Sequence, residues 1–82
     1  MNKKELLQQC IHHPNNIHFD DFVGLIEAFG FVLVIKSSSH HIFKHPEIPE
    51  LMNLQNVKGE AKPYQIRQFL KTIERNDLKL KE

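Results

Sequence analysis

Two strand-like stretches, residues 31–36 and 40–45, lie close together in the chain, with only Ser37, Ser38 and Ser39 between them. The first stretch is rich in β-branched residues, which favours a mostly buried strand. Three consecutive serines favour a turn. Strands joined by so short a connection usually lie side by side and antiparallel. The chain is therefore expected to contain a β-hairpin, and the rest of the fold has to pack against it.

Helical patterns flank this hairpin on both sides. Before it, apolar residues recur at spacings of three and four, which places them on one face of a helix. Gly30 follows and is suited to end that helix with a positive φ angle. After the hairpin, Pro63 suits the first turn of another helix. The apolar faces comprise Phe19, Phe22, Val23, Ile26 and Phe29 in the first helix, and Ile66, Phe69, Leu70 and Ile73 in the second.

A third strand is expected over residues 51–57, and a further helix precedes all of these elements. Asn2 and Glu5 have the spacing of a capping box at the start of that helix. Cys10 lies in its apolar stripe and is expected to face the core; as the single cysteine, it cannot form an internal disulfide. We therefore expect an accessory N-terminal helix over residues 1–14 and the main domain over residues 17–82.

The order of elements defines the fold class. Helix, three strands and helix indicate an α+β domain with a three-stranded antiparallel sheet and both helices on one face. The opposite face of the sheet is then left to solvent or to a partner. At 82 residues the chain is long enough for one domain.

Charge is unevenly distributed along a chain whose formal net charge is only +1. From Lys58 onward there are seven basic residues and four acidic ones. Arg67, Lys71 and Arg75 recur every four residues, so they form a basic ridge on the exposed side of the last helix. Lys58 and Lys62 extend this charge to the start of the helix. The ridge fits a track for the phosphate backbone of a nucleic acid, or an ordinary solvated helix face.

The longest apolar run, residues 31–35, is too short to span a membrane. The N-terminus lacks the apolar stretch of a secretory signal. We therefore expect a cytoplasmic protein with no membrane partner.

The second strand opens on a histidine pair, His40 and His41, beside a serine turn and the basic Lys36. Histidine is the side chain best able to move protons near neutral pH. The plainer interpretation is a hairpin with exposed histidines. No metal site is expected, because His40 and His41 point to opposite faces, and His41 and His45 are about 13 Å apart along one strand.

Three segments together are distinctive: residues 28–31 read AFGF, residues 39–46 read SHHIFKHP, and residues 53–70 read NLQNVKGEAKPYQIRQFL. In these segments the chain resembles the HicA family of bacterial toxins. The resemblance covers roughly residues 19–80. It implies a fold like that of double-stranded-RNA-binding domains and an mRNA interferase that needs no metal or other cofactor. It also implies neutralisation by a HicB-type antitoxin. The key histidine of the family corresponds to His40. Two positions depart from the family pattern: Ser38 replaces a glycine, and Asn56 replaces a second histidine.

The hypothesis is cleavage of mRNA with His40 as the single catalytic residue. His40 would act as general base on a ribose 2′-hydroxyl or as acid on the departing 5′-oxygen, while His41 and His45 would pack or face solvent. The alternatives are a non-catalytic RNA-binding module and a protein-interaction domain of the same fold. No direct binding of DNA is expected. The residues expected to contact RNA are Lys36, Ser38, Ser39, Lys44, Lys58, Lys62, Arg67 and Lys71.

Overall fold

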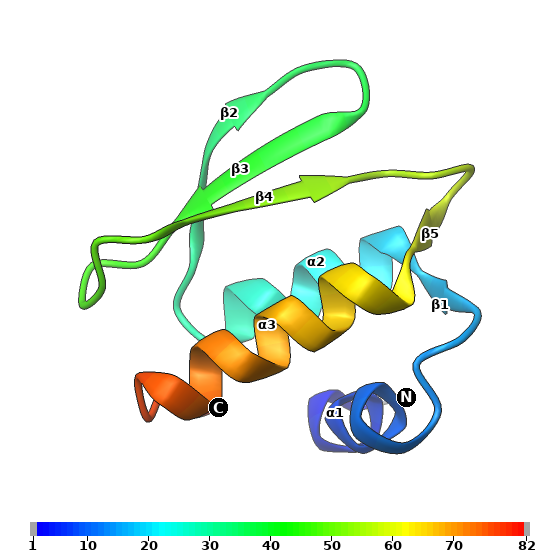
Figure 1. Ribbon diagram of the computed structural model, residues 1–82, viewed down its shortest axis with the longest axis horizontal. Helices are drawn as coiled ribbons and strands as arrows, with labels where there is room; N and C mark the ends of the chain where they lie inside the picture. The colour runs from blue at the N-terminus through cyan, green and yellow to red at the C-terminus, as the bar shows by residue number, and fades with distance from the viewer. Residues whose placement is uncertain (1, 82) are drawn as a thin grey trace.

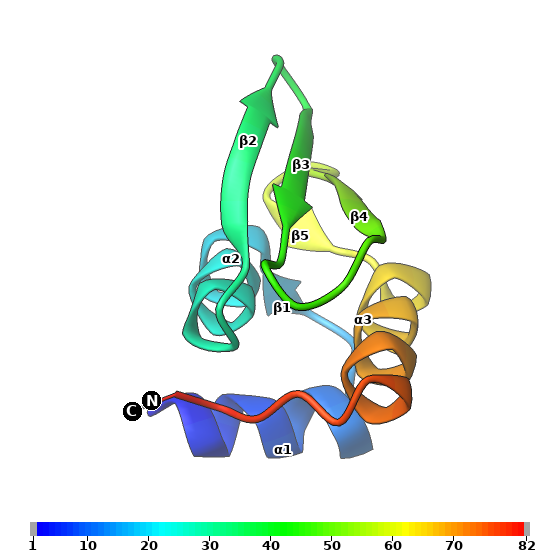
Figure 2. The same ribbon diagram turned by 90° about the vertical axis from the view of Figure 1, so that its left-hand side faces the viewer.

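The protein is built in three layers: a sheet, a pair of helices beneath it, and a single helix beneath the pair (Figure 1, Figure 2). The structure is a computed structural model, and it describes residues 2–81. The elements in chain order are α1 (Lys3–His12), β1 (Ile17–His18), α2 (Phe19–Ala28), β2 (Val32–Lys36), β3 (His40–Lys44), β4 (Leu51–Gln55), β5 (Glu60–Ala61) and α3 (Pro63–Arg75).

The main sheet has the strand order β2-β3-β4, and both of its strand pairs are antiparallel. Helices α2 and α3 lie on one side of it (Figure 2). The predicted α+β class, with helix, three antiparallel strands, helix and an additional N-terminal helix, is confirmed. We call the side of the sheet that faces α2 and α3 the inner face and the opposite side the outer face. Strand β3 is shorter than expected and ends at Lys44, and β4 ends at Gln55.

A second, two-stranded sheet joins parts of the chain that are far apart in sequence. Strand β1 pairs with β5 in antiparallel fashion, with Ile17 opposite Ala61 and His18 opposite Glu60. The sequence did not predict this pair of strands, because a two-residue strand is too short to show an alternating pattern of apolar and polar residues. The pairing holds the start of α2 close to the start of α3.

The helices begin and end where local chemistry indicates. Asn2 and Glu5 form the expected capping box: the Asn2 side chain accepts a hydrogen bond from the Glu5 N–H at 2.8 Å, and the reciprocal bond is 3.2 Å. Gly30 has φ +99°, as expected for the residue that follows α2, and Pro63 occupies the first turn of α3.

The core lies between the inner face and the two helices, with an aromatic cluster at its centre. The Phe69 ring makes edge contacts with Phe22, Phe29 and Phe31 at centroid distances of 5.5, 5.4 and 6.1 Å. Such edge-to-face pairs add to the stabilisation from burial. The sheet contributes Phe43, which is fully buried.

Helix α1 packs against this unit from the side opposite the sheet (Figure 2). Leu6 and Cys10 are buried in the same core cluster as the residues of α2 and α3. Burial raises the pKa of the Cys10 thiol to about 11, in keeping with the expected core position. The ends of the two expected domain ranges at residues 1 and 82 lie outside the described residues.

One expectation about the sheet is wrong. The stretch that precedes the serine turn is not mostly buried: Val32 is 60% exposed, Val34 50% and Ile35 57%, and only Phe31 at its start is buried. The reason is that β2 lies at the edge of the sheet and that α2 and α3 cover only the inner face. An apolar run predicts burial on both faces, but the fold provides cover on one.

Candidate functional site

The backbone of His40 is fixed at the first position of β3. The carbonyl of His40 accepts a hydrogen bond from the Ser37 N–H at 2.9 Å, which closes the serine turn. On the other side, His40 lies opposite Gln55 in β4. The carbonyl of Ser39 accepts a hydrogen bond from the Asn56 N–H at 2.8 Å. The backbone at His40 is therefore held by the residues that follow β2 and β4.

The side chain of His40 is exposed and lies on the outer face. Its Nδ1 atom is 3.4 Å from the hydroxyl oxygen of Ser39, a long contact for a hydrogen bond. Among residues 2–81, no hydrogen bond engages its Nε2 atom. A rigid base, one polar neighbour and an open ring nitrogen are what proton transfer to or from an external molecule requires.

His41, the next residue, lies on the inner face. Its ring packs against Phe19 of α2 at a centroid distance of 5.0 Å, and the residue is half-buried. Its Nδ1 atom is buried and has no hydrogen-bond partner among the described residues. Neighbouring strand residues point to opposite faces, so the two histidines have different surroundings.

His45 is a structural residue. It is 1% exposed, and its ring packs against Phe31 at 5.0 Å. The Glu47 N–H donates to Nδ1 at 3.0 Å, and Nε2 is 3.0 Å from the carbonyl oxygen of Phe29. Because Nδ1 accepts, Nε2 carries the proton and donates to Phe29. Both ring nitrogens are thus used inside the fold.

The turn after β4 lies against the serine turn. The side-chain oxygen of Asn56 accepts a hydrogen bond from the Gly59 N–H at 2.7 Å. Lys58 and Gly59 both have positive φ angles, 53° and 82°. The hydrogen bond from the Gly59 N–H to the Asn56 side chain stabilises this turn. Asn56 therefore shapes the backbone beside His40.

The expected RNA-binding residues separate into groups. Ser38 and Ser39 lie in the serine turn beside His40, and Lys36 ends β2 at the same edge of the sheet. Lys36 lies opposite His41, however, and so shares the inner face. Lys44 shares the outer face with His40 but lies four residues along the strand, at a distance of about 13 Å.

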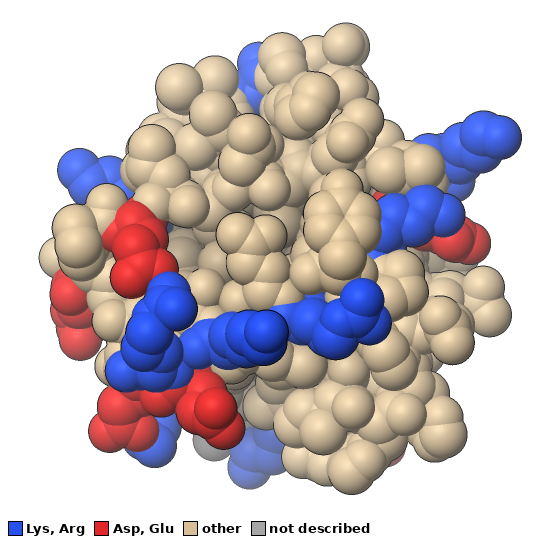
Figure 3. All heavy atoms as spheres, viewed as in Figure 1, with Lys and Arg blue, Asp and Glu red and all other residues tan. Residues whose placement is uncertain are grey.

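The remaining cations follow α3. Arg67 and Lys71 are exposed, and Figure 3 shows basic side chains in a row across the face that α3 occupies in Figure 1. Lys62 occupies the N-cap position of the helix, and its Nζ atom lies 3.9 Å from Oε1 of Glu60. Arg75, at the other end of the ridge, forms an ion pair with Glu50. Lys58 lies in the turn that follows β4. The row therefore leads from the C-terminal end of α3 to the turns around His40.

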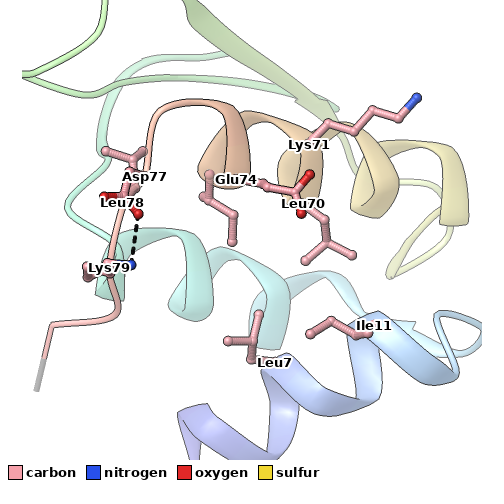
Figure 4. A pocket seen from close by; sticks show the side chains of 9 residues that line it. Leu7, Ile11, Leu70, Lys71, Glu74, Asp77, Leu78 and Lys79 are labelled. Atoms are coloured by element: carbon pink, nitrogen blue, oxygen red, sulfur yellow. Dashed lines mark ion pairs between the residues drawn. The ribbon is translucent and has the colours of Figure 1, made fainter.

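A groove on the far side of the helix pair was not predicted. It lies between α1 and α3, with a volume of about 480 Å³. Leu7 and Ile11 of α1 face Leu70 of α3 across it (Figure 4). Asp77 and Lys79, which form an ion pair at 2.8 Å, line one end. Because the helix layer separates the groove from the sheet, the groove plays no part in the surroundings of His40.

Two general features complete the description. Across residues 2–81, no three His, Cys, Asp or Glu side chains come together in a group suited to a metal ion. Over the same part of the chain, the helices are too short and too polar to cross a membrane.

Fold and site together define a small α+β protein whose sheet is open on one face and presents an exposed histidine at the start of its central strand. Residues 19–74 match the family model of the HicA toxin of bacterial toxin–antitoxin systems. Since the match spans α2, the whole main sheet and most of α3, the chain belongs to this family of toxins, whose members act with an antitoxin partner. No curated protein and no solved structure matches the chain.

Proposed function

We propose that this toxin is a metal-independent endoribonuclease that cuts mRNA in the cytoplasm, with His40 as its catalytic residue and a HicB-type antitoxin as its inhibitor. The observation that carries the proposal is the open Nε2 atom of His40 on a backbone that is hydrogen-bonded on both sides. Membership of the toxin family supports it. By contrast, His45 uses both ring nitrogens within the protein.

The reaction needs no group beyond the RNA and this chain. As general base, Nε2 of His40 takes the proton of a ribose 2′-hydroxyl while the 2′-oxygen attacks the adjacent phosphorus. The bond from phosphorus to the 5′-oxygen breaks, a 2′,3′-cyclic phosphate forms, and the leaving oxygen receives a proton from the imidazolium or from water. Such proton transfer contributes about 10²–10⁴-fold to a rate.

The neighbouring polar groups have separate tasks. The Ser39 hydroxyl lies next to the ring of His40 and donates to the charge that develops on the phosphoryl oxygens. Lys36 adds positive charge at the same edge of the sheet. Lys44 lies too far along β3 for the same phosphate, so it binds a flanking part of the RNA. Ser38 shapes the turn between these groups.

The row along α3 supplies the binding surface for the rest of the substrate. Lys58, Lys62, Arg67 and Lys71 lead toward the turns around His40. Contacts between such cations and phosphates release counterions, which makes binding fall steeply as salt rises. The RNA is held chiefly by its backbone and is cut where it passes His40.

Growth inhibition upon induced expression tests the proposal. We expect His40→Ala to abolish inhibition, because the proton acceptor is lost, while the thermal transition stays unchanged. His12→Ala is the matched control, since His12 is also exposed but lies at the end of α1. We expect His12→Ala to inhibit growth like the wild type. Equal toxicity of the His40→Ala protein would rule out the catalytic assignment.

A non-catalytic RNA-binding module is the second candidate. One observation favours it: the position expected to hold a second histidine is Asn56, whose side-chain oxygen is used in its own turn. This candidate predicts salt-sensitive retention of RNA without fragments. Gel analysis of a labelled RNA incubated with the purified protein separates the two functions.

A further inference from the structure

Tyr64 is an exposed aromatic ring in a protein that buries its phenylalanines. Each of the six phenylalanines is 3% exposed or less and lies in the core. Tyr64, the single tyrosine of a chain without tryptophan, is 56% exposed. The other large apolar side chains that are exposed within residues 2–81 are aliphatic. Tyr64 therefore offers the surface an accessible aromatic ring at one defined place.

The ring lies on the same face of α3 as the row of basic residues (Figure 3). At about 100° per residue, Tyr64 and Lys71 differ by about 20° around the helix axis, and Arg67 lies about 60° from Tyr64. All three side chains are exposed. Because Tyr64 belongs to the first turn of α3, it lies at the end of the row that leads to the turns around His40. An RNA strand that follows the row toward His40 passes this ring.

A short stretch of chain connects the start of α3 to the site. The Asn56 N–H donates to the carbonyl of Ser39, the residue before His40, and the chain then runs through β5 to Pro63. In Figure 1, α3 begins on the side of the molecule where the loop between β2 and β3 lies. However, α3 is on the inner side of the sheet, whereas the side chain of His40 is on the outer face. Tyr64 is therefore placed for a nucleotide that flanks the cut one.

A buried side chain restrains the exposed ring. The Gln65 Nε2 atom donates a hydrogen bond to the hydroxyl oxygen of Tyr64 at 3.3 Å. Gln65 is 1% exposed, and its Oε1 atom has no hydrogen-bond partner among the described residues. Burial of an amide costs free energy, and here the amide is used to hold the hydroxyl end of a surface ring. A ring that is already held loses less conformational freedom when a base stacks on it.

We propose that Tyr64 is a stacking platform for one unpaired base of the RNA, next to the nucleotide that is cut. The inference rests on RNA as the substrate under the proposed function, and it adds that the RNA is single-stranded where it crosses the start of α3. Unpaired bases stack on aromatic side chains, while cations beside the ring hold the phosphates. Arg67 and Lys71 are such cations, and they favour a polyanion over a protein surface. Both faces of a base in a duplex are covered by its neighbours, so Tyr64 selects single-stranded RNA.

The intrinsic fluorescence of the protein reports this contact directly, because the chain has one tyrosine and no tryptophan. The probes are a short single-stranded RNA of mixed sequence and the same strand annealed to its complement. Each is titrated into the untagged full chain carrying His40→Ala, which prevents cleavage. We expect the single strand to quench the tyrosine emission, since stacking brings a base against the ring.

Substitutions at Tyr64 measure the contribution of the ring, with affinities taken from the anisotropy of labelled RNA. Tyr64→Leu should weaken binding of the single strand at least about tenfold, within the range found when one stacked base loses its aromatic partner. Tyr64→Phe is the matched control, since it keeps the ring and should stay within about threefold of the parent. Binding of the duplex should not distinguish the three proteins.

The outcomes are distinct. Quenching by the single strand, with a loss from Tyr64→Leu on the single strand alone, supports the stacking platform. Equal affinities of Tyr64→Leu and the parent, equal losses on single strand and duplex, or an absence of quenching overturns it. Unchanged RNA affinity with weaker binding of Tyr64→Leu to the antitoxin would assign the ring to a protein interface and also overturn it. Thermal unfolding confirms that both variants are folded.

Failure of this inference can be told apart from failure of the proposed function. If the wild type binds single-stranded RNA through Tyr64 but releases no fragments, the nuclease assignment is wrong and the stacking platform stands. If the wild type cuts RNA and Tyr64→Leu binds the single strand as tightly as the parent, the stacking platform is wrong and the nuclease assignment stands.

Discussion

A histidine lies at each end of strand β3, one exposed to solvent and the other buried. At one end, His40 is exposed, and its only hydrogen-bond contact by a ring atom within residues 2–81 is the long one to Ser39 at 3.4 Å. At the other end, just past the strand, His45 is 1% exposed and uses both nitrogens in 3.0 Å contacts to backbone groups. The residues are five apart, and the sequence around them is similarly basic.

The difference shows that one residue type can be enclosed in the fold or left open to an external molecule, according to its surroundings. A histidine whose nitrogens are both satisfied inside the protein cannot exchange protons with a substrate unless the fold opens. A histidine on a fixed backbone with a free nitrogen can do so without structural change. We therefore expect substitutions at the His45 end to change stability and substitutions at the His40 end to change activity.

The largest effect on stability is expected from His45→Ala. It leaves the Phe29 carbonyl and the Glu47 N–H without their partner in a buried place, and it creates a cavity beside Phe31. Unsatisfied buried groups cost about 1–3 kcal/mol each, so the free energy of unfolding should fall by about 3 kcal/mol. Urea denaturation measures it. His45→Gln, which restores one donor, should lose less; a full loss in both variants would contradict the hydrogen-bonding explanation.

Gly30→Ala disturbs the surroundings of His45 through a change in the neighbouring backbone. Gly30 has φ +99°, and a Cβ atom there would lie 2.9 Å from Nε2 of His45. Strain at positive φ alone costs about 1–2 kcal/mol, so we expect a loss of about 2 kcal/mol in the free energy of unfolding. Gly24→Ala is the control, because its Cβ would meet only the Lys3 side chain in a helix. That variant should be neutral or slightly stabilised, and equal losses would refute the steric argument.

Asn56→Ala probes the His40 end. It removes the acceptor for the Gly59 N–H and loosens the turn that bonds to the Ser39 carbonyl. We expect a loss of about 1 kcal/mol in the free energy of unfolding, together with slower RNA cleavage. Asn56→Asp retains an acceptor oxygen and should preserve both properties better. Slower cleavage with unchanged stability in the Ala variant would assign Asn56 a direct contact with RNA instead.

The smallest effect is expected from substitutions in the row of basic residues on α3, and it concerns RNA affinity. Replacing Arg67 and Lys71 by Gln removes two exposed cations without touching the core. Each lost phosphate contact should reduce the slope of log affinity against log salt by about one, as measured by filter binding at several salt concentrations. Lys79→Gln, on the C-terminal tail beside Asp77, is the control and should leave the slope unchanged. An equal slope in all three proteins would make the row an ordinary solvated face.

The sequence predicted most of the fold because its signals are local. Gly30, Pro63 and the capping pair Asn2 and Glu5 act within a few residues, and the structure confirms each of them. The exposure of β2 was mispredicted because burial depends on which face the helices cover, and no local pattern carries that information. The irregularity in β2 between Leu33 and Ile35, where the register shifts, is likewise set by pairing with β3.

The site was predictable only in part. The serine turn and the histidine pair indicated where to look, but the spacing could not distinguish His40 from His45. The partner of His45 is the carbonyl of Phe29, 16 residues away, so its structural role depends on tertiary packing. The link between the Asn56 and Ser39 turns is also a contact between separate strands. Neither has a signature in the neighbouring sequence.

The most direct test of the central claim compares RNA cleavage by three purified proteins: the wild type, His40→Ala and His45→Gln. A labelled mRNA is incubated with each in EDTA at a temperature where thermal unfolding shows all three to be folded. We predict fragments from the wild type and from His45→Gln and none from His40→Ala. Fragments from His40→Ala, or cleavage lost only in the folded His45→Gln protein, would contradict the assignment of chemistry to the exposed end of β3.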